Sequence, residues 1–306
     1  MRIIITGATG FIGRALCEHM AERGHEVIAL TRSLAKAQGL LGEPVKSVKW
    51  DGRSAQGWVS LADGAGAIVN LAGENIGSRR WTQATKRAIL QSRLNVGRAV
   101  VEAVELSTAK PKVIIQASGV GYYGPHGDEI LDESSPCGEG FLSDVAHQWE
   151  ASTKPVEAMG VRRVVIRTGG VLEREGGMLP RLLLPFRLFI GGPLGGGRAW
   201  FSWIHQDDEV AAIRFLIENE DVRGVFNLTA PEPLTMRDFC RLLGHVTRRP
   251  SWLPVPGFVL RLLFGEMADA LLLSGQRVLP KRLQEAGFEF KYPTAETALR
   301  AILVAH

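Results

Sequence analysis

A glycine-rich turn near the start of the chain constrains the fold more than any other feature of the sequence. It runs Thr6-Gly7-Ala8-Thr9-Gly10-Phe11-Ile12-Gly13, after the β-branched run 2–6 and at the start of the amphipathic segment 11–23. Glycines three residues apart allow a tight turn, close approach of the backbone to a pyrophosphate and close packing of helix on sheet. We therefore interpret Gly7, Gly10 and Gly13 as a dinucleotide-binding loop rather than a plain structural turn.

Short β-branched runs alternate with longer amphipathic segments through the first half of the chain. The expected strands are 2–6, 26–30, 47–50, 67–71, 112–117 and 163–167, and the clearest helices are 11–23, 82–104 and 141–159. This alternation is typical of βαβ units in a parallel sheet. It predicts an α/β fold with a Rossmann-type doubly wound sheet.

The rhythm changes after residue 170. A glycine-rich loop covers 191–197, and a helix at 207–219 and a strand at 225–228 are expected to return to the main sheet. Residues from about 231 onward are mostly helical in pattern. We therefore expect a nucleotide-binding domain over 1–170, completed by 203–230, and a small C-terminal substrate lobe built from 171–202 and 231–306.

Composition excludes several classes of protein. The 306 residues carry a net charge of +4, but the charges alternate in sign and form no basic run, which argues against nucleic-acid binding. No apolar stretch is long enough to span a membrane, and the N-terminus lacks the pattern of a signal peptide. Cys17, Cys137 and Cys240 are far apart in sequence, which favours a reducing cytoplasm and predicts neither disulfides nor a metal site.

Several motifs in order along the chain resemble the extended short-chain dehydrogenase/reductase superfamily. They are the glycine loop with Thr9, Phe11 and Ile12, the run Asn70-Leu71-Ala72-Gly73, Ser118 followed by Tyr123-Gly124, and Trp203-Ile204-His205 before Asp207-Asp208. A narrower resemblance, to the subgroup called epimerase family proteins, rests on segments 70–76, 80–81, 92–93, 121–123, 184–187 and 273–288. The resemblance covers nearly the whole chain. It implies that Thr9, Phe11, Ile12, Leu71, Ala72 and Gly73 also contact the cofactor.

The catalytic pattern of that superfamily is interrupted here. Its usual Tyr-x-x-x-Lys pair would fall on Phe141 and Val145, or on Leu142 and Ala146 one residue later. Neither register supplies the acid or the lysine that lowers its pKa. An asparagine expected in the helix 82–104 is replaced by Arg93.

The remaining candidates for chemistry stand at predicted strand ends. Ser118 ends the fifth strand and is expected to position substrate or nicotinamide, with a plain strand-end serine as the alternative. Tyr123 is the most plausible substitute acid, with a packing role as the alternative. Tyr122, Glu74 and His205 are weaker candidates, for which packing or solvent exposure is the alternative. Four aromatic side chains are expected either to line a pocket or to fill the core: Trp81, Trp200, Phe201 and Trp203.

The choice of cofactor is decided where the second strand ends. An acidic residue there would bind the ribose 2′-hydroxyl of NAD, but this chain has Thr31 and Arg32, which suit a 2′-phosphate. The sequence therefore predicts NADP(H), with a plain surface charge as the alternative reading of Arg32. Arg93 and Arg167 are expected to meet phosphate or ribose oxygens, with a salt bridge to a carboxylate as the alternative for each.

Two functions remain open at this stage. One is an NADP(H)-dependent oxidoreductase or epimerase-like enzyme with an unidentified small carbonyl or hydroxyl substrate, in which Ser118 and Tyr123 act. The other is a non-catalytic NADP(H)-binding sensor, which the missing Tyr and Lys would permit. Dimerisation through two long helices is common in the superfamily and is expected here only by analogy.

Overall fold

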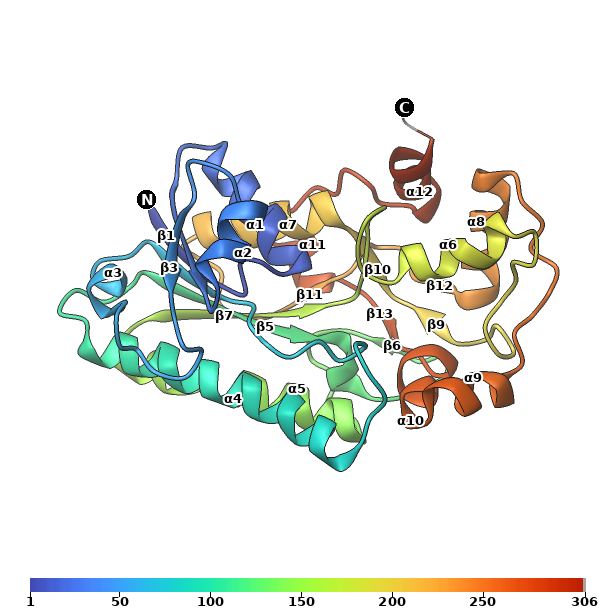
Figure 1. Ribbon diagram of the computed structural model, residues 1–306, viewed down its shortest axis with the longest axis horizontal. Coiled ribbons are helices and arrows are strands. Elements are labelled where there is room, and N and C mark those ends of the chain that lie inside the picture. The colour runs from blue at the N-terminus through green and yellow to red at the C-terminus, as the bar shows by residue number, and fades with distance from the viewer. Residues whose placement is uncertain (305–306) are drawn as a thin grey trace.

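Seven parallel strands form the centre of the computed structural model, which describes residues 1–304 (Figure 1). Their order across the sheet is β11-β7-β5-β4-β1-β2-β3. The bounds are β1 Arg2–Thr6, β2 Glu26–Thr31, β3 Lys46–Lys49, β4 Ala67–Asn70, β5 Val113–Gly119, β7 Arg162–Thr168 and β11 Gly224–Leu228. From β1 the chain adds β2 and β3 on one side and then β4, β5, β7 and β11 on the other, so the order of the strands reverses between β1 and β4. Ligands of open α/β sheets bind at such a point, beyond the carboxyl ends of the strands.

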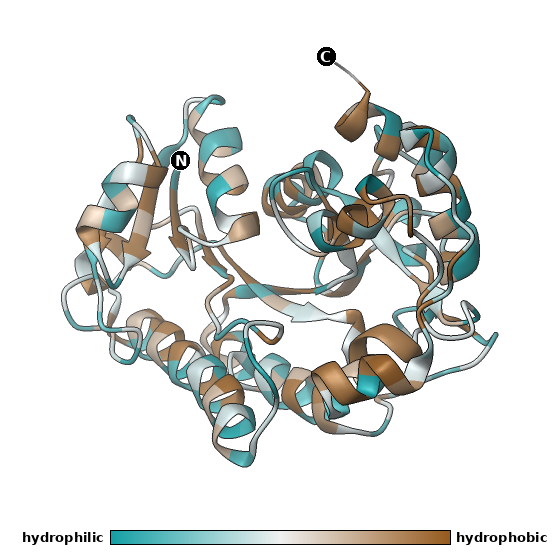
Figure 2. Cartoon of the chain, turned by 45° about the vertical axis from the view of Figure 1, so that its right-hand side comes forward, coloured by the Kyte–Doolittle hydropathy of each residue, from teal (hydrophilic) through white to brown (hydrophobic). Residues whose placement is uncertain are grey.

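Helices cover both faces of the sheet (Figure 1). Side chains of α1 (Phe11–Ala21), α2 (Leu34–Leu40) and α7 (Gln206–Glu218) share one core with Ile3 and Ile5. Side chains of α3 (Val59–Ala62) and α4 (Gln83–Leu106) share a second core with Ile4. Alternate residues of β1 thus point to opposite faces and are buried on both, as parallel strands require. The N-terminal strands are accordingly brown in Figure 2.

The predicted doubly wound sheet is confirmed, and the predicted strand ends agree with the observed ones to within two residues. The predicted helix 141–159 differs, because it is divided into α5 (Phe141–Ala151) and a 3₁₀ helix, η2 (Lys154–Met159). Pro155 explains the division. Proline has no backbone N–H, and its ring would collide with the carbonyl of Ala151 if the helix continued.

The C-terminal lobe has an apolar core of its own. Leu172, Phe186, Trp203, Phe239 and Leu299 are among its buried members. It is built from β8 Gly170–Leu172, α6 Leu179–Arg187, β9 Trp200–Phe201, β10 Trp203–His205, β12 Leu234–Thr235, α8 Met236–Thr247, α9 Gly257–Phe264, α10 Glu266–Ala268, the π-helix η3 Asp269–Leu273 and α12 Ala295–Leu303. No helix within residues 1–304 is long and apolar enough to cross a membrane.

One part of the predicted lobe packs elsewhere. Helix α11 (Lys281–Glu285) lies against β11, and Leu283 and Phe288 join the core between the sheet and α7. The short strand β13 (Arg277–Val278) pairs with β6 (Ile130–Leu131). The expected boundary of 231–306 therefore differs from the structure, in which the chain crosses back to the sheet before α12.

Candidate functional site

The glycine loop is shaped by two glycines that no other residue can replace without strain. Gly7 has a left-handed φ of 71°, and a Cβ on Gly13 would collide with the Gly7 carbonyl oxygen. Gly10 is the N-cap of α1 and carries no side chain that could occupy the free backbone amides. The first turn of α1 also holds no acidic residue. The helix N-terminus is therefore open to an anionic ligand.

A buried chain of side-chain hydrogen bonds fixes a second loop beside the first. The Thr6 hydroxyl donates to Asn70 Oδ1 at 2.9 Å and accepts from the Ala72 N–H at 3.2 Å. Asn70 Nδ2 donates to Gln116 Oε1 at 2.8 Å, which links β1, β4 and β5. A Cβ on Gly7 would lie 3.0 Å from the Ala72 backbone. The predicted loops at Gly7 and at Leu71, Ala72 and Gly73 are thus brought together.

The carboxyl ends of β2 and β3 enclose a positively charged hollow. It has a volume of about 370 Å³, and Arg32 and Lys49 line it together with Trp50, Asp51, Ser54 and Gln56. Thr31, the last residue of β2, is buried and does not line the hollow, and its hydroxyl donates to the Ser33 carbonyl at 3.2 Å. Arg32 thus stands where the sequence predicts it. Lys49 is a second cation that the sequence reasoning missed, because it belongs to a different strand.

A larger cleft of about 430 Å³ lies between the carboxyl edge of the sheet and the C-terminal lobe. Ile12, Ser118 and Thr168 line it from the sheet side, and Trp200 and Phe201 from β9. Helix α5 contributes only apolar side chains, namely Leu142, Val145, Ala146 and Trp149. Three of the four positions that could have held a Tyr-x-x-x-Lys pair, Leu142, Val145 and Ala146, therefore present apolar side chains to this cleft.

Arg93 lines the same cleft as a buried and incompletely bonded cation. Its side chain is 8% exposed, and its guanidinium donates to the carbonyls of Ile89 at 2.9 Å and Glu74 at 3.1 Å. Its carbon Cζ lies 4.7 Å from the centre of the Trp149 ring. Burial lowers the pKa of Arg93 to about 10, which leaves it charged at neutral pH. Its Nε–H finds no acceptor among residues 1–304 and is itself buried from solvent.

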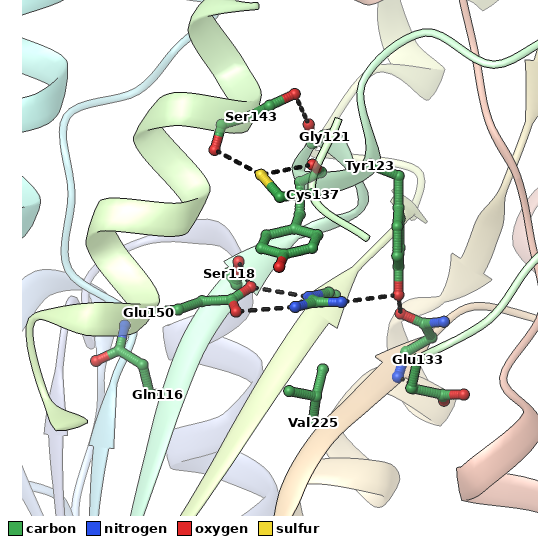
Figure 3. A network of polar contacts seen from close by, with 12 residues as sticks. Gln116, Ser118, Gly121, Tyr123, Glu133, Cys137, Ser143, Glu150 and Val225 are labelled. Atoms are coloured by element: carbon green, nitrogen blue, oxygen red, sulfur yellow. Dashed lines mark hydrogen bonds and ion pairs between the residues drawn. The ribbon is translucent and has the colours of Figure 1, made fainter. Parts of the chain in front are cut away.

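Ser118 begins a buried polar network that leads away from the cleft. Its hydroxyl donates to Glu150 Oε1 at 2.7 Å, and Arg167 donates to both oxygens of Glu150 at 2.8 and 3.0 Å (Figure 3). Arg167 also donates to the Tyr123 hydroxyl at 3.1 Å, which in turn donates to Asn227 Oδ1 at 2.7 Å. The network therefore joins β5, α5, β7 and β11 beneath the cleft.

Two predicted site residues lie inside this network and do not reach the cleft. Tyr123 is 0% exposed, and burial raises its pKa to about 12, so it is no accessible acid. Arg167 is 3% exposed and takes the predicted alternative, a salt bridge to a carboxylate. The guanidinium carbon of Arg167 lies over the Tyr122 ring, 3.3 Å from the centre of the ring. These placements correct the expectation that Tyr123 and Arg167 face substrate and cofactor.

The weaker candidates have structural roles. His205 caps α7, accepting from the Asp207 N–H at 3.0 Å, and burial lowers its pKa to about 4. Glu74 lies 3.5 Å from Arg79 in an ion pair. Trp81 stacks edge-on against Phe141, and Trp203 is fully buried in the lobe's core. Within residues 1–304, no group of three or more His, Cys, Asp or Glu side chains is placed to hold a metal ion.

Sequence reasoning missed a second hydroxyl–carboxyl pair at the cleft. The Thr168 hydroxyl donates to Glu209 Oε1 at 2.8 Å, and the Glu209 side chain is 0% exposed. Burial raises the pKa of Glu209 to about 8. Its spacing to Ile213 and Leu216 places it on the apolar stripe of α7, and an acid in that stripe is the signal that could have found it.

The fold and the glycine loop are those of a Rossmann-type dinucleotide-binding protein. Residues 3–150 match the NAD dependent epimerase/dehydratase family, and residues 255–302 match a domain of unknown function, DUF1731. The epimerase family protein SDR39U1 homolog, chloroplastic, of Arabidopsis thaliana is 43% identical over 99% of this chain and 87% of its own. The epimerase family protein YfhF of Bacillus subtilis is 40% identical over 99% of this chain and 98% of its own. The chain therefore belongs to the epimerase family.

A solved structure extends this likeness to three dimensions. The human epimerase family protein SDR39U1 (isoform 2), crystallised with NADPH, is 35% identical and covers 100% of both chains with a TM-score of 0.89. The resemblance inferred from the motifs is thus confirmed over the whole chain. The ligand of that relative is the cofactor that the sequence predicts for this protein.

Proposed function

We propose that this protein binds NADP(H) and uses it to reduce or oxidise a small, largely apolar carbonyl or hydroxyl compound. The observation that carries the proposal is the joint placement of Ser118 and the unsatisfied Arg93 in an apolar cleft. Ile12, in the first turn of α1, lines the same cleft, so the open N-terminus of this helix lies next to it. A pyrophosphate at α1 would leave the nicotinamide end of a dinucleotide pointing towards these groups.

The residues present fit this cofactor. The amides at the start of α1 suit a pyrophosphate, and the Arg32–Lys49 hollow suits a 2′-phosphate. Arg93 contributes a positive charge to the lining of the cleft. NADPH found in the human relative supports the same assignment. When bound, NADP(H) would give or accept a hydride at the substrate carbon.

The chain's own residues would bind, orient and exclude water. The Ser118 hydroxyl can accept a hydrogen bond from substrate while it donates to Glu150. The wall of α5, together with Trp200 and Phe201, favours flat or apolar substrates and keeps water from the reacting atoms. A Tyr-Lys pair takes no part, since Leu142, Val145 and Ala146 occupy its place.

Three measurements test the proposal. The dissociation constants of NADPH and NADH should differ by at least tenfold in favour of NADPH, and NADP⁺ should accompany turnover of a member of a carbonyl library. Deuteride from the 4-deuterated cofactor should appear on the product carbon. A protein that binds neither cofactor, or that prefers NADH, would overturn the cofactor assignment.

The second candidate function is a non-catalytic NADP(H) sensor. The apolar face of α5 and the burial of Tyr123 favour it, because both remove the usual acid from the cleft. Tight NADPH binding with no deuteride transfer across the library would support the sensor over the enzyme. For either function we propose a cytoplasmic location, consistent with Cys17, Cys137 and Cys240 being free thiols.

A further inference from the structure

Two residues that line the cleft each donate a hydroxyl hydrogen bond to a buried carboxyl group. Ser118 donates to Glu150 and Thr168 donates to Glu209, at 2.7 and 2.8 Å. The two hydroxyls come from neighbouring strands, because Thr168 pairs in register with Gly119. Both carboxyl groups are therefore hydrogen-bonded to residues that line the cleft.

The two carboxyl groups differ in their other partners. Glu150 accepts three hydrogen bonds, one from Ser118 and two from Arg167, so both its oxygens are already occupied by donors. Glu209 accepts one, from Thr168, and its Oε2 has no partner among residues 1–304. An unpartnered carboxyl oxygen at 0% exposure is costly as an anion and favourable as a protonated group. Glu209 is thus the carboxyl group that can store a proton.

We propose that Thr168 and Glu209 form a proton relay that serves the cleft in place of the missing Tyr-Lys pair. This inference rests on the proposed function. The relay requires the protonated Glu209 to carry its proton on Oε1 and to donate it to Thr168 across the same 2.8 Å contact, so that the Thr168 O–H turns to the substrate. In reduction, the substrate oxygen takes the hydroxyl proton of Thr168 as its carbon gains the hydride, and Thr168 takes the proton from Glu209 Oε1. The O–H bond of Thr168 is broken and remade, and Glu209 is left as the carboxylate. Oxidation runs the same transfers backwards.

The other titratable groups near the start of α7 already have hydrogen-bond or ion-pair partners. Asp208 accepts the backbone N–H groups of Lys291 and Tyr292, both at 2.9 Å or less. Asp207 pairs with the Lys291 ammonium at 2.9 Å. His205, neutral because burial lowers its pKa to about 4, caps the helix. Burial is accordingly the main cause that raises the pKa of Glu209, and the Thr168 hydrogen bond works against it.

The test combines infrared spectroscopy with turnover of a defined probe, 9,10-phenanthrenequinone with NADPH. Wild type at neutral pH should show the carbonyl band of a protonated carboxyl group, which Glu209→Gln removes and Thr168→Val shifts. Glu209→Gln and Thr168→Val should each lower kcat about 100-fold or more, whereas Thr168→Ser restores it. The dissociation constant of NADPH should change less than threefold in all of them. Glu218→Gln, on the exposed end of the same helix, is the matched control.

Each outcome decides one claim. Full kcat in Glu209→Gln, or no protonated carboxyl band that depends on Glu209, overturns the relay while leaving the reductase function intact. If wild type transfers nothing to the quinone or to the carbonyl library, the enzymatic function fails and the relay fails as a catalytic device. A Glu209 band that still shifts in Thr168→Val would then define only a buried hydrogen-bonded acid.

Discussion

Arg167 binds Glu150 through two parallel hydrogen bonds of 2.8 and 3.0 Å, in a position where both side chains are almost fully buried. The pair fastens β7 to α5 directly beneath Ser118. The ion pair therefore supports Ser118 at the edge of the cleft, although neither Arg167 nor Glu150 lines the cleft itself. A buried ion pair stabilises the fold only while both partners are present, because either partner alone would be a buried and unpaired charge.

Replacing Arg167 by Met should lower the free energy of unfolding by roughly 3–5 kcal/mol, the usual result of breaking a buried ion pair. Urea denaturation followed by circular dichroism measures it. The double variant Arg167→Met, Glu150→Gln should recover part of the loss, because no uncompensated charge remains. A double variant as unstable as the single one would contradict this account.

Tyr123→Phe and Ser118→Ala should separate structure from function. Loss of the Tyr123 hydroxyl leaves Asn227 Oδ1 and one Arg167 N–H without their partner, which should cost about 1–3 kcal/mol of stability with kcat nearly unchanged. Ser118→Ala should instead lower kcat/KM and leave the unfolding midpoint within a few degrees of wild type. A drop in kcat for Tyr123→Phe at full stability would restore Tyr123 as the acid.

Gly13→Ala should abolish tight NADPH binding. The added Cβ would meet the carbonyl oxygen of Gly7 and the backbone of Ala8, neither of which can move without opening the loop. Gly39→Ala is the matched control, because a Cβ there meets nothing within 4 Å and the residue lies inside α2. Alanine in a helix interior is favoured over glycine by about 1 kcal/mol, so this control should be slightly stabilised. Titration calorimetry with NADPH compares the two.

Arg32→Ala and Lys49→Ala should each weaken NADPH binding about tenfold or more and leave NADH binding almost unchanged. The reason is that both cations line the hollow assigned to the 2′-phosphate. Lys46→Ala, on the same strand but paired with Glu26, is the control. The salt dependence of NADPH affinity should also decrease in the first two variants. Equal losses for NADPH and NADH would remove the hollow from the cofactor site.

The contribution of His205 to the stability of the protein should be lost on acidification, whereas buried Glu209, whose pKa is raised to about 8, contributes in the opposite direction in both proteins compared below. The pKa of His205 is lowered from 6.5 to about 4 in the folded state, so the unfolded chain binds the proton first as the pH falls. The contribution is present above about pH 6.5 and should amount to a loss of about 2 kcal/mol between about pH 7 and pH 5. His205→Asn keeps an N-cap acceptor and should lose less stability over that interval. An identical pH dependence in both proteins would contradict the assignment.

Local patterns in the sequence were sufficient for the frame of the fold and for the cofactor loop. The glycines of the first turn act on backbone atoms within a few residues, and the central strands β1, β4 and β5 are buried over most of their length, so both leave a local trace. Pro155 left such a trace too, yet the helical periodicity beyond it suggested a longer helix than the structure has.

The catalytic assignments depended on partners that the sequence does not bring together. Tyr123 stands where an accessible acid would be useful, but its hydroxyl is claimed by Asn227, which is 104 residues away. Arg167 meets Glu150 on a different element, and Lys49 joins Arg32 across two strands. Thr168 and Glu209 are separated by 41 residues, which include β8, α6, β9 and β10 of the C-terminal lobe. Only packing decides which of these side chains face the cleft.

The apolar wall of α5 has a consequence for the evolution of selectivity. In a protein whose proton donor sits on that helix, any change there risks the chemistry along with the fit. Here Leu142 and Ala146 line the cleft while the hydroxyls stand on β5 and β7. Substitutions at these two positions can therefore change the shape of the substrate-binding cleft in small steps without altering the groups that transfer protons. A library randomised at these two positions would sample new substrates from a working scaffold.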